Sequence, residues 1–338
     1  MSDAEAPGPG RRRATSADVA RESGVSRATV SYVLNRKAGQ SIPQETRERV
    51  LEAARRLNYV PSVSARALRS GRTDIVVLAM PNLPQGPVLS AFVHELAAGL
   101  AAGGLTLVTH LDDREQPKLL DVVQALAPVA VISYPQLPDE PNRQIVKAGV
   151  EWVTGVNLSM TGSEVDDREW ARLPGRLQAG HLLARGHTRI GFAWPQDPTL
   201  APIAQDRLDG VTSRCAAAGL APPRVLTVPI EVSQAAEAVV GWRAGQVTAV
   251  CCYNDDVALA VLAGAHRVGL AVPRDLAVVG VDDIPLAALA TPPLTTVYAP
   301  SDQQGATVAA RLLALVAGEA PPVPEHPMTM SVVLRGSA

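Results

Sequence analysis

The stretch Thr15–Leu34, Thr-Ser-Ala-Asp-Val-Ala-Arg-Glu-Ser-Gly-Val-Ser-Arg-Ala-Thr-Val-Ser-Tyr-Val-Leu, decides the organisation of the N-terminal part of this chain. Apolar residues recur at helical spacing on both sides of Gly24, which predicts two short helices joined by a turn. Ser26 is a favourable N-cap for the second helix. That helix has the size of a DNA major groove, so the pattern is typical of a helix-turn-helix. The alternative is a pair of helices packed in an ordinary bundle.

The charge distribution favours a polyanionic partner for the N-terminal head alone. Residues 11–72 contain 14 Lys and Arg against 5 Asp and Glu, a net charge of +9, whereas the whole chain of 338 residues carries −2 and the remainder therefore −11. A basic head on an acidic body is typical of nucleic-acid binding by the head. The Arg11-Arg12-Arg13 run is expected to be a flexible basic arm, although such runs alone are usually just solvated.

The residues after this motif narrow the interpretation. A third helix is predicted at Gln44–Leu57, with Pro43 near its start. Collinear with it are the pieces Asp18-Val19-Ala20, Gly24-Val25-Ser26, Thr29-Val30-Ser31, Val33-Leu34-Asn35, Thr46-Arg47, Leu57-Asn58-Tyr59, Pro61 and Ala65-Arg66-Ala67-Leu68-Arg69. On these pieces the chain resembles the lactose-repressor (LacI/GalR) family of bacterial transcription regulators, and the resemblance continues over nearly all 338 residues.

The resemblance implies that the second helix reads bases through Arg27, Ala28 and Tyr32. An arginine can bind a guanine through two hydrogen bonds, an alanine offers a methyl contact, and a tyrosine offers a hydroxyl and a ring. The alternative for Arg27 is a phosphate contact. The positions that match phosphate-binding residues, which hold the register without reading sequence, are Thr15, Ser26, Thr29, Ser31 and Asn35.

The resemblance also implies a hinge helix at Ser62–Arg69, which is too short to be stable alone in water. It is expected to fold only on operator DNA, paired with the hinge of a dimer mate. Ala65, Leu68 and Arg69 would lie at the minor groove, with Leu68 wedged into a central base step so that the duplex bends. The alternative is that Leu68 is a linker leucine packed on the body.

Beyond residue 73, apolar runs of strand length alternate with Ala- and Leu-rich helical stretches such as Leu89–Ala102 and Ala204–Ala218. This alternation predicts parallel sheets covered by helices on both faces, and the length favours two lobes. The candidate strands are Ile75–Met80, Leu105–Thr109, Val129–Ser133, Trp152–Val156, Arg189–Trp194, Val225–Val228, Val247–Tyr253, Leu276–Asp282 and Leu294–Tyr298.

The predicted architecture is a small all-α helix-turn-helix head and an α/β body with the two-lobed, periplasmic-binding-protein-like fold that the resemblance implies. Strands that cross between the lobes are expected near residues 168–173, 298–301 and 325–328. The expected divisions are an arm at 1–13, a DNA-binding domain at 14–61, a hinge at 62–72 and an effector-binding and dimerisation domain at 73–338, with the N-lobe at about 73–170 and 300–326 and the C-lobe at about 171–298 and 327–338.

Ligands of such folds lie in the crevice at the carboxyl ends of the strands. Arg207, Asn254 and Asp282 match effector-binding positions of the family, and side chains of this kind suit a polyhydroxylated, sugar-like ligand. Two alternatives stay open. Arg207 and Asp282 pair with each other across an empty cleft, or Asn254 and Asp255 cap the helix that follows.

The sequence departs from the family around this cleft. Residues 81–88, Pro-Asn-Leu-Pro-Gln-Gly-Pro-Val, replace an Asn-Pro-Phe-Phe-like segment, Ala299 stands where a glutamine is frequent, and Val281 where an aromatic residue is frequent. Aromatic residues make up only 3% of the chain, which puts a plain sugar pocket in doubt. Trp194 and Trp242 are candidate substitutes, although either is more often a core residue.

The remaining residues indicate no further chemistry. Cys215, Cys251 and Cys252 have no metal-ligand spacing and are best interpreted as small core residues in a reducing compartment. His181, His187 and His266 have no triad partners, and no phosphate-binding glycine loop is evident. We expect no cofactor, no metal and no catalytic activity. Without a secretory signal or a membrane-length span, the sequence predicts a cytoplasmic protein.

The sequence therefore predicts a homodimeric transcription regulator, most simply a repressor, that binds a near-palindromic operator in double-stranded DNA. A small molecule in the cleft is expected to control it allosterically, by lobe closure that orders or melts the hinge helices. The alternatives are an effector-independent regulator with a degenerate cleft and a solute-binding protein with a vestigial head. An enzyme on the same lobes lacks a plausible catalytic constellation.

Overall fold

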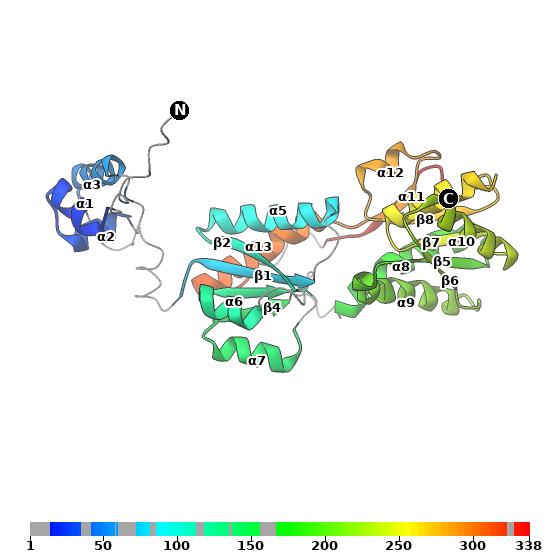
Figure 1. Cartoon of the computed structure of the whole chain (residues 1–338), viewed down its shortest axis with the longest axis horizontal. Coiled ribbons are helices and arrows are strands. Elements are labelled where there is room, and N and C mark those ends of the chain that lie inside the picture. Colours follow the sequence, from blue (N-terminus) through cyan, green and yellow to red (C-terminus); the bar gives the residue numbers. More distant parts are fainter. Residues whose placement is uncertain are drawn as a thin grey trace, which may run out of the picture. The chain divides into compact units, whose positions relative to one another are not determined.

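The structure is a computed structural model that describes residues 14–34, 42–57, 59, 72–81, 86–112, 118–134, 137–155, 167–322 and 328–338. The chain forms two compact units, Met1–Asp74 and Ile75–Ala338, which are described separately below (Figure 1). The first unit contains the head and the second contains both lobes of the body.

The head consists of α1 (Ser16–Ser23), α2 (Arg27–Leu34) and α3 (Gln44–Arg56). Thr15 and Asp18 cap α1 reciprocally, because the Asp18 amide donates to Thr15 Oγ1 and the Thr15 amide donates to the Asp18 carboxylate. Gly24 ends this helix with a positive φ, in the left-handed region, which confirms the predicted turn. All three helices meet in one small core; its buried members are Val19, Ala20, Val30, Val33, Val50, Ala53 and Ala54.

The first lobe of the body has a parallel sheet in the order β2-β1-β3-β4. Its strands are β1 (Ile75–Pro81), β2 (Thr106–Asp112), β3 (Ala130–Ser133) and β4 (Trp152–Gly155), and its helices are α5 (Pro87–Ala102), α6 (Leu119–Leu126), α7 (Asp139–Lys147) and α13 (Ser301–Ala317). Figure 1 shows α5 and α13 along one side of the sheet and α6 and α7 along the other.

Alternation along β1 explains why this sheet is covered on both faces. Val76 and Leu78 pack into the core under α5 and α13, whereas Val77 and Ala79 pack into the core under α6 and α7. Because successive side chains of a strand point to opposite faces, a continuous apolar run needs helices on both. The sequence pattern predicted this arrangement correctly.

The second lobe has a six-stranded sheet in the order β10-β9-β8-β7-β5-β6. Its strands are β5 (Ile190–Pro195), β6 (Arg224–Val228), β7 (Ala249–Cys252), β8 (Ala277–Val281), β9 (Thr295–Tyr298) and β10 (Ser331–Val333), and its helices are α8 (Asp167–Ala184), α9 (Ala201–Ala217), α10 (Val232–Ala244), α11 (Asp255–Arg267) and α12 (Pro285–Leu289), with a 3-10 turn at Pro198–Leu200. Cys251 and Cys252 are buried in β7, as expected of core residues.

Two details differ from the expectation. Residues 168–173 do not cross as a strand but form the first turns of α8, where Arg172 and Arg176 both pair with Glu169 at helical spacing. The second sheet is not wholly parallel, because β10 runs antiparallel to β9. After β9 the chain crosses to the first lobe, where it forms α13. It then re-enters the second sheet next to the C-terminal end of β9, so β10 runs antiparallel to β9.

No helix in the described part of the chain has both the length and the apolar character needed to cross a membrane.

Candidate functional site: a DNA-binding head and an interlobe cavity

The head presents one face of α2 to solvent. Val30 and Val33 point into its core, whereas Arg27 and Ala28 are exposed and Tyr32 is half-buried. The N-terminal residues of α2 are thus accessible to a ligand as large as a duplex, as required of a recognition helix. Asn35, Ala65, Leu68 and Arg69 lie outside the described residues, and so does the predicted hinge.

The hydroxyl groups that we assigned to phosphate contacts also organise the head. Ser26 Oγ accepts a hydrogen bond from the Thr29 amide at 3.1 Å and lies 2.9 Å from Thr29 Oγ1, so Ser26 caps α2 as predicted. Thr15 Oγ1 donates to Asp18 Oδ2 at 2.7 Å within the capping box. These bonds fix the first turn of α1 and the first turn of α2.

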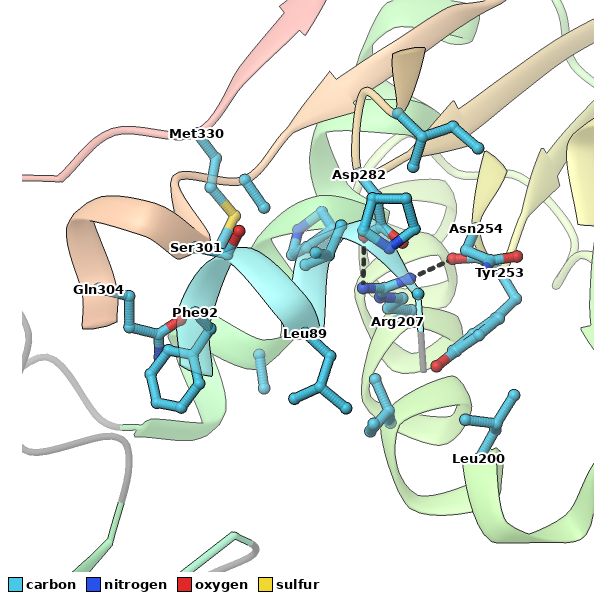
Figure 2. Close-up of a pocket in the computed structure, with 18 of the residues that line it drawn as sticks. Leu89, Phe92, Leu200, Arg207, Tyr253, Asn254, Asp282, Ser301, Gln304 and Met330 are labelled. Carbon is cyan, nitrogen blue, oxygen red and sulfur yellow. Dashed lines mark hydrogen bonds and ion pairs between the residues drawn. The ribbon is translucent and has the colours of Figure 1, made fainter. Parts of the chain in front are cut away.

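A cavity of about 380 Å³ lies between the two lobes of the body. Its wall includes side chains that follow the carboxyl ends of strands, as expected for ligand sites of α/β folds. Arg207, Asn254 and Asp282, which are far apart in the sequence, all line it (Figure 2). The structure therefore brings together the three residues that sequence reasoning assigned to one site.

Arg207 of α9 is the centre of the polar end of the cavity. Its Nη2 lies 3.2 Å from Asp282 Oδ1, its Nη1 donates to the carbonyl oxygen of Tyr253, and its guanidinium lies 4.7 Å from the centre of the Tyr253 ring. Only 13% of each side chain of the Arg207–Asp282 pair is exposed. Burial raises the pKa of Asp282, and the nearby guanidinium opposes that rise.

Close contact of α8 with α9 sets the position of Arg207. The two helices cross where Gly175 faces the carbonyl oxygen of Arg207 and Gly210 faces the carbonyl oxygen of Arg172. A Cβ atom built at Gly175 would lie 2.0 Å from its facing oxygen, and one at Gly210 would lie 2.1 Å from its own. Only glycine permits this approach, so the backbone under Arg207 is held directly against α8.

Asn254 and Asp282 occupy comparable positions after neighbouring strands. Asn254 caps α11, because its Oδ1 accepts from the Val257 amide at 3.0 Å, while its Nδ2 lies 3.5 Å from Asp256 Oδ2. Asp282 and Asp283 both have a positive φ, which residues other than glycine rarely adopt. Two contacts that the sequence raised are present: Arg207 pairs with Asp282, and Asn254 caps α11, whereas the Asp255 carboxylate bonds to Ile284 and Thr296 instead of capping that helix.

The turn that carries Asp282 is anchored from two sides. Asp255 is fully buried; its Oδ2 accepts from the Ile284 amide at 2.9 Å and its Oδ1 from Thr296 Oγ1 at 2.6 Å. Burial raises the pKa of Asp255 to about 7, although these two bonds oppose the rise. From the other side, Arg335 Nη2 donates to Asp283 Oδ1 at 2.6 Å.

Sequence reasoning missed the aromatic part of the wall. Phe92, Tyr134, Trp170 and the ring side of Tyr253 line the cavity together with apolar residues such as Leu89. Trp170 lies in a segment that was expected to cross between the lobes as a strand. Tyr134 follows a predicted strand directly, as Asn254 does, and this position could have marked it as a residue of the cavity wall. Burial raises the pKa of Tyr134 to about 12.

Neither of the two tryptophans proposed as substitutes lies in the wall of this cavity. Trp242 is fully buried, and its Nε1 donates to the Arg224 carbonyl at 2.9 Å. Trp194 packs edge-on against Phe192, with ring centres 6.3 Å apart. A low overall aromatic content therefore does not mean a pocket without aromatic rings, because the fold gathers scattered rings at one place.

Two family models match the chain. One, described as bacterial regulatory proteins of the lacI family, matches residues 15–62, and the other, a periplasmic binding protein-like domain, matches residues 179–338. The two matches correspond to the head and to the larger part of the body.

Curated relatives match over almost their whole length. The regulator MalR of Streptomyces coelicolor is 32% identical over 95% of this chain and 95% of its own. The regulator reg1 of Streptomyces lividans is 30% identical, again with 95% of each chain covered. The ribose operon repressor of Escherichia coli is 30% identical over 86% of this chain and 90% of its own.

Solved structures agree. A lac repressor dimer bound to operator and the anti-inducer ONPF has a TM-score of 0.76 at 25% identity, with 96% of this chain and 99% of that chain covered. A complex of the regulator CelR with cellobiose has a TM-score of 0.62 at 28% identity, with 96% and 100% covered. The chain therefore belongs to the lacI family of bacterial regulatory proteins: it is a DNA-binding transcriptional repressor, not an enzyme, and it carries a periplasmic-binding-protein-like effector domain.

Proposed function

We propose that the protein acts in the cytoplasm as a homodimer on a near-palindromic operator. Arg27, Ala28 and Tyr32 read bases in the major groove, and Thr15, Ser26, Thr29, Ser31 and Asn35 contact phosphates. The exposure of Arg27 and Ala28 on α2 supports this assignment. Ala65, Leu68 and Arg69 enter the minor groove at the centre of the site, by analogy with the family alone.

The effector we propose is a small polyhydroxylated molecule bound through Arg207, Asn254 and Asp282. The observation that carries this proposal is the buried Arg207–Asp282 pair at the wall of a cavity of about 380 Å³. A guanidinium and a carboxylate each form paired hydrogen bonds with neighbouring hydroxyl groups. The rings of Trp170 and Phe92 supply apolar faces on which a sugar ring can pack, and the CelR relative is known in complex with cellobiose.

Control of DNA binding follows from a shift between two states of the body. A ligand that touches both lobes favours the closed state by its difference in affinity for the two states. The cavity has walls from both lobes, with Leu89 and Gln304 on one side and Arg207 and Asp282 on the other (Figure 2). Closure then alters the spacing of the N-lobes of a dimer and so orders or melts the paired hinges.

Site selection from random duplexes by the full-length protein tests the DNA part. We expect a two-fold symmetric site with a C-G step at its centre. An asymmetric site, or no enrichment, contradicts the dimeric hinge arrangement.

Calorimetric titration against a panel of polyols, monosaccharides and disaccharides tests the effector part. The expected result is at least one binder whose heat of binding is lost in Asp282→Asn. A binder that the variant still accepts with unchanged affinity contradicts the assigned site.

A second candidate function is regulation of transcription without an effector. It is favoured by the contacts that Arg207 and Asn254 already make within the protein. Arg207 already donates from Nη2 to Asp282 and from Nη1 to the Tyr253 carbonyl, and the Asn254 side-chain oxygen is engaged in a helix cap. In that case operator affinity is independent of every compound in the panel, and Asp282→Asn represses in cells as the unaltered protein does.

A further inference from the structure

A buried glutamine, Gln178, contacts the carboxyl ends of the two strands that lead to Asn254 and Asp282. Gln178 of α8 is fully buried. Its Nε2 lies 2.9 Å from the carbonyl oxygens of Cys252 and Val279 and 3.1 Å from that of Gly280, so its two N–H groups serve three acceptors and one of them is shared. One side-chain amide therefore bridges the carboxyl ends of β7 and β8.

These carbonyl groups lie where the ladder between the two strands ends. The pairing of β7 with β8 runs from Ala249 opposite Ala277 to Cys251 opposite Val279 and goes no further. Beyond that point β8 stays paired with β9 as far as Val281 opposite Val297, but its pairing with β7 does not continue. There Gln178 links the two strands through its side-chain amide, from a helix that is distant in the sequence.

Two of the residues proposed to bind the effector come shortly after these strand ends in the sequence. Asn254 comes two residues after Cys252, and Asp282 comes two residues after Gly280. We propose that Gln178 is a positioning residue of the effector site: its amide holds the diverging ends of β7 and β8 and so sets where Asn254 and Asp282 stand relative to Arg207. This inference rests on the proposed effector role of those three residues.

The orientation of the amide is determined by its surroundings. The opposite orientation would place Oε1 against three carbonyl oxygens, which repel it. In the present orientation Oε1 is buried without a hydrogen-bond partner among the described atoms. Leaving one polar atom of a buried side chain unsatisfied is unfavourable. Here the other polar atom, Nε2, offsets this cost by donating its two N–H groups to carbonyls at the strand ends.

The backbone beyond Gly280 shows what these bonds maintain. Asp282 and Asp283 keep positive φ angles, and such conformations persist only where the surrounding contacts hold them. At its start the turn is held by Gln178 and by the bond from the Asp282 amide to the Val297 carbonyl, and beyond it by Arg335 on Asp283 and by Asp255 on the Ile284 amide. Removing the Gln178 contact loosens the start of the turn and lets Asp282 relax away from Arg207, while Asp255 and Arg335 keep the rest of the turn attached to the lobe.

The test compares Gln178→Met with Leu182→Met by hydrogen exchange of the full-length protein without any effector. Both positions are fully buried on α8, and methionine fills the volume in both, but only the first substitution removes a donor. In Gln178→Met we expect the amides of Asp282 and Ile284 to exchange about tenfold faster, with the amides of β1 unchanged. A crystal structure of this variant should show Asp282 displaced from Arg207 Nη2.

Gln178→Asn provides a second variant that keeps the amide but shortens its reach, and we expect exchange intermediate between the unaltered protein and Gln178→Met. The inference is overturned if the amides at 282–284 exchange in both variants as they do in Leu182→Met, or if exchange rises equally in both lobes. Because no ligand is present, a protein that binds no effector leaves this result untouched, and the two proposals fail separately.

Discussion

Gly175→Ala is the substitution that tests most directly how the cavity is built. The new Cβ would lie 2.0 Å from the Arg207 carbonyl oxygen and 2.9 Å from the Val211 amide nitrogen. Both obstacles are backbone atoms of a helix, so they cannot rotate away as a side chain would. Helices α8 and α9 must therefore move apart, and Arg207 moves with them.

The expected cost is the upper end of the range for overpacking, about 3 kcal/mol. Alanine offsets this by about 0.5–1 kcal/mol, because glycine is the poorer helix former. A net loss of about 2 kcal/mol corresponds to a fall of roughly 4–8 °C in the melting temperature of a domain of this size. We expect effector binding to weaken as well, since the shift separates Arg207 from Asp282.

Gly180→Ala is the matched control on the same helix. Its Cβ would meet only Arg214 Nε, at 3.5 Å, which is an ordinary contact with a flexible side chain. This variant should gain about 0.5–1 kcal/mol from helix propensity alone. Thermal unfolding followed by circular dichroism measures both variants. If Gly175→Ala melts at or above the temperature of the unaltered protein, the close crossing of α8 and α9 does not position Arg207.

Four further predictions concern the DNA contacts, the effector site and pH. Arg27→Ala should lower discrimination at one base pair by about 1–3 kcal/mol; site selection with unchanged preference at every position would refute base reading. Leu68→Ala should weaken specific binding far more than non-specific binding, as measured by fluorescence anisotropy on operator and random duplexes, and equal losses on both would remove the wedge role. Asp282→Asn should keep the operator affinity of the effector-free protein but lose the effector response, because asparagine tolerates the positive φ yet carries no charge; a normal response would contradict the site. Burial raises the pKa of Asp255 to about 7, so the folded protein holds a proton there that the unfolded chain releases near its ordinary, lower pKa. This contribution to stability is present at low pH and is lost as pH rises through about 7, with a slope of up to about 1.4 kcal/mol per pH unit; denaturant titrations from pH 5 to 8 should show stability falling up to about pH 7 and levelling off above it in the unaltered protein, and neither change in Asp255→Asn.

The local patterns of the sequence predicted the elements well. Gly24 ends α1 with a positive φ, Ser26 caps α2, and α3 begins at Gln44 as expected. All nine candidate strands are present, with ends that differ by a few residues. These features depend on hydrogen bonds and side-chain periodicity within a few residues, so the sequence contains the information needed.

The two predictions that were wrong, the strand at 168–173 and the wholly parallel second sheet, concern features that depend on distant parts of the chain. Helix α8 begins before residue 168 and continues through Pro174, because its first turns pack where charge pairs and the cavity wall support a helix. The direction of β10 depends on the excursion of the chain through α13, which no property of residues 331–333 reveals. The residue pattern of a strand indicates that it joins a sheet. It does not indicate from which end of the sheet the connecting chain enters the strand, and so it does not predict the direction of the strand.

What the sequence by itself determined is the family, the helix-turn-helix with its exposed Arg27, the two-lobed α/β body, and the three residue types expected in the cleft. Only the tertiary structure decided that Arg207 is engaged by Asp282, 75 residues away, and that scattered rings such as Trp170 and Tyr134 meet in one wall. Likewise, only the tertiary structure placed the amide of Gln178 against the ends of strands that lie 74 or more residues away in the sequence. The physical reason is that helices and strands arise from interactions between neighbours in the chain, whereas a binding site arises from distances that packing alone sets.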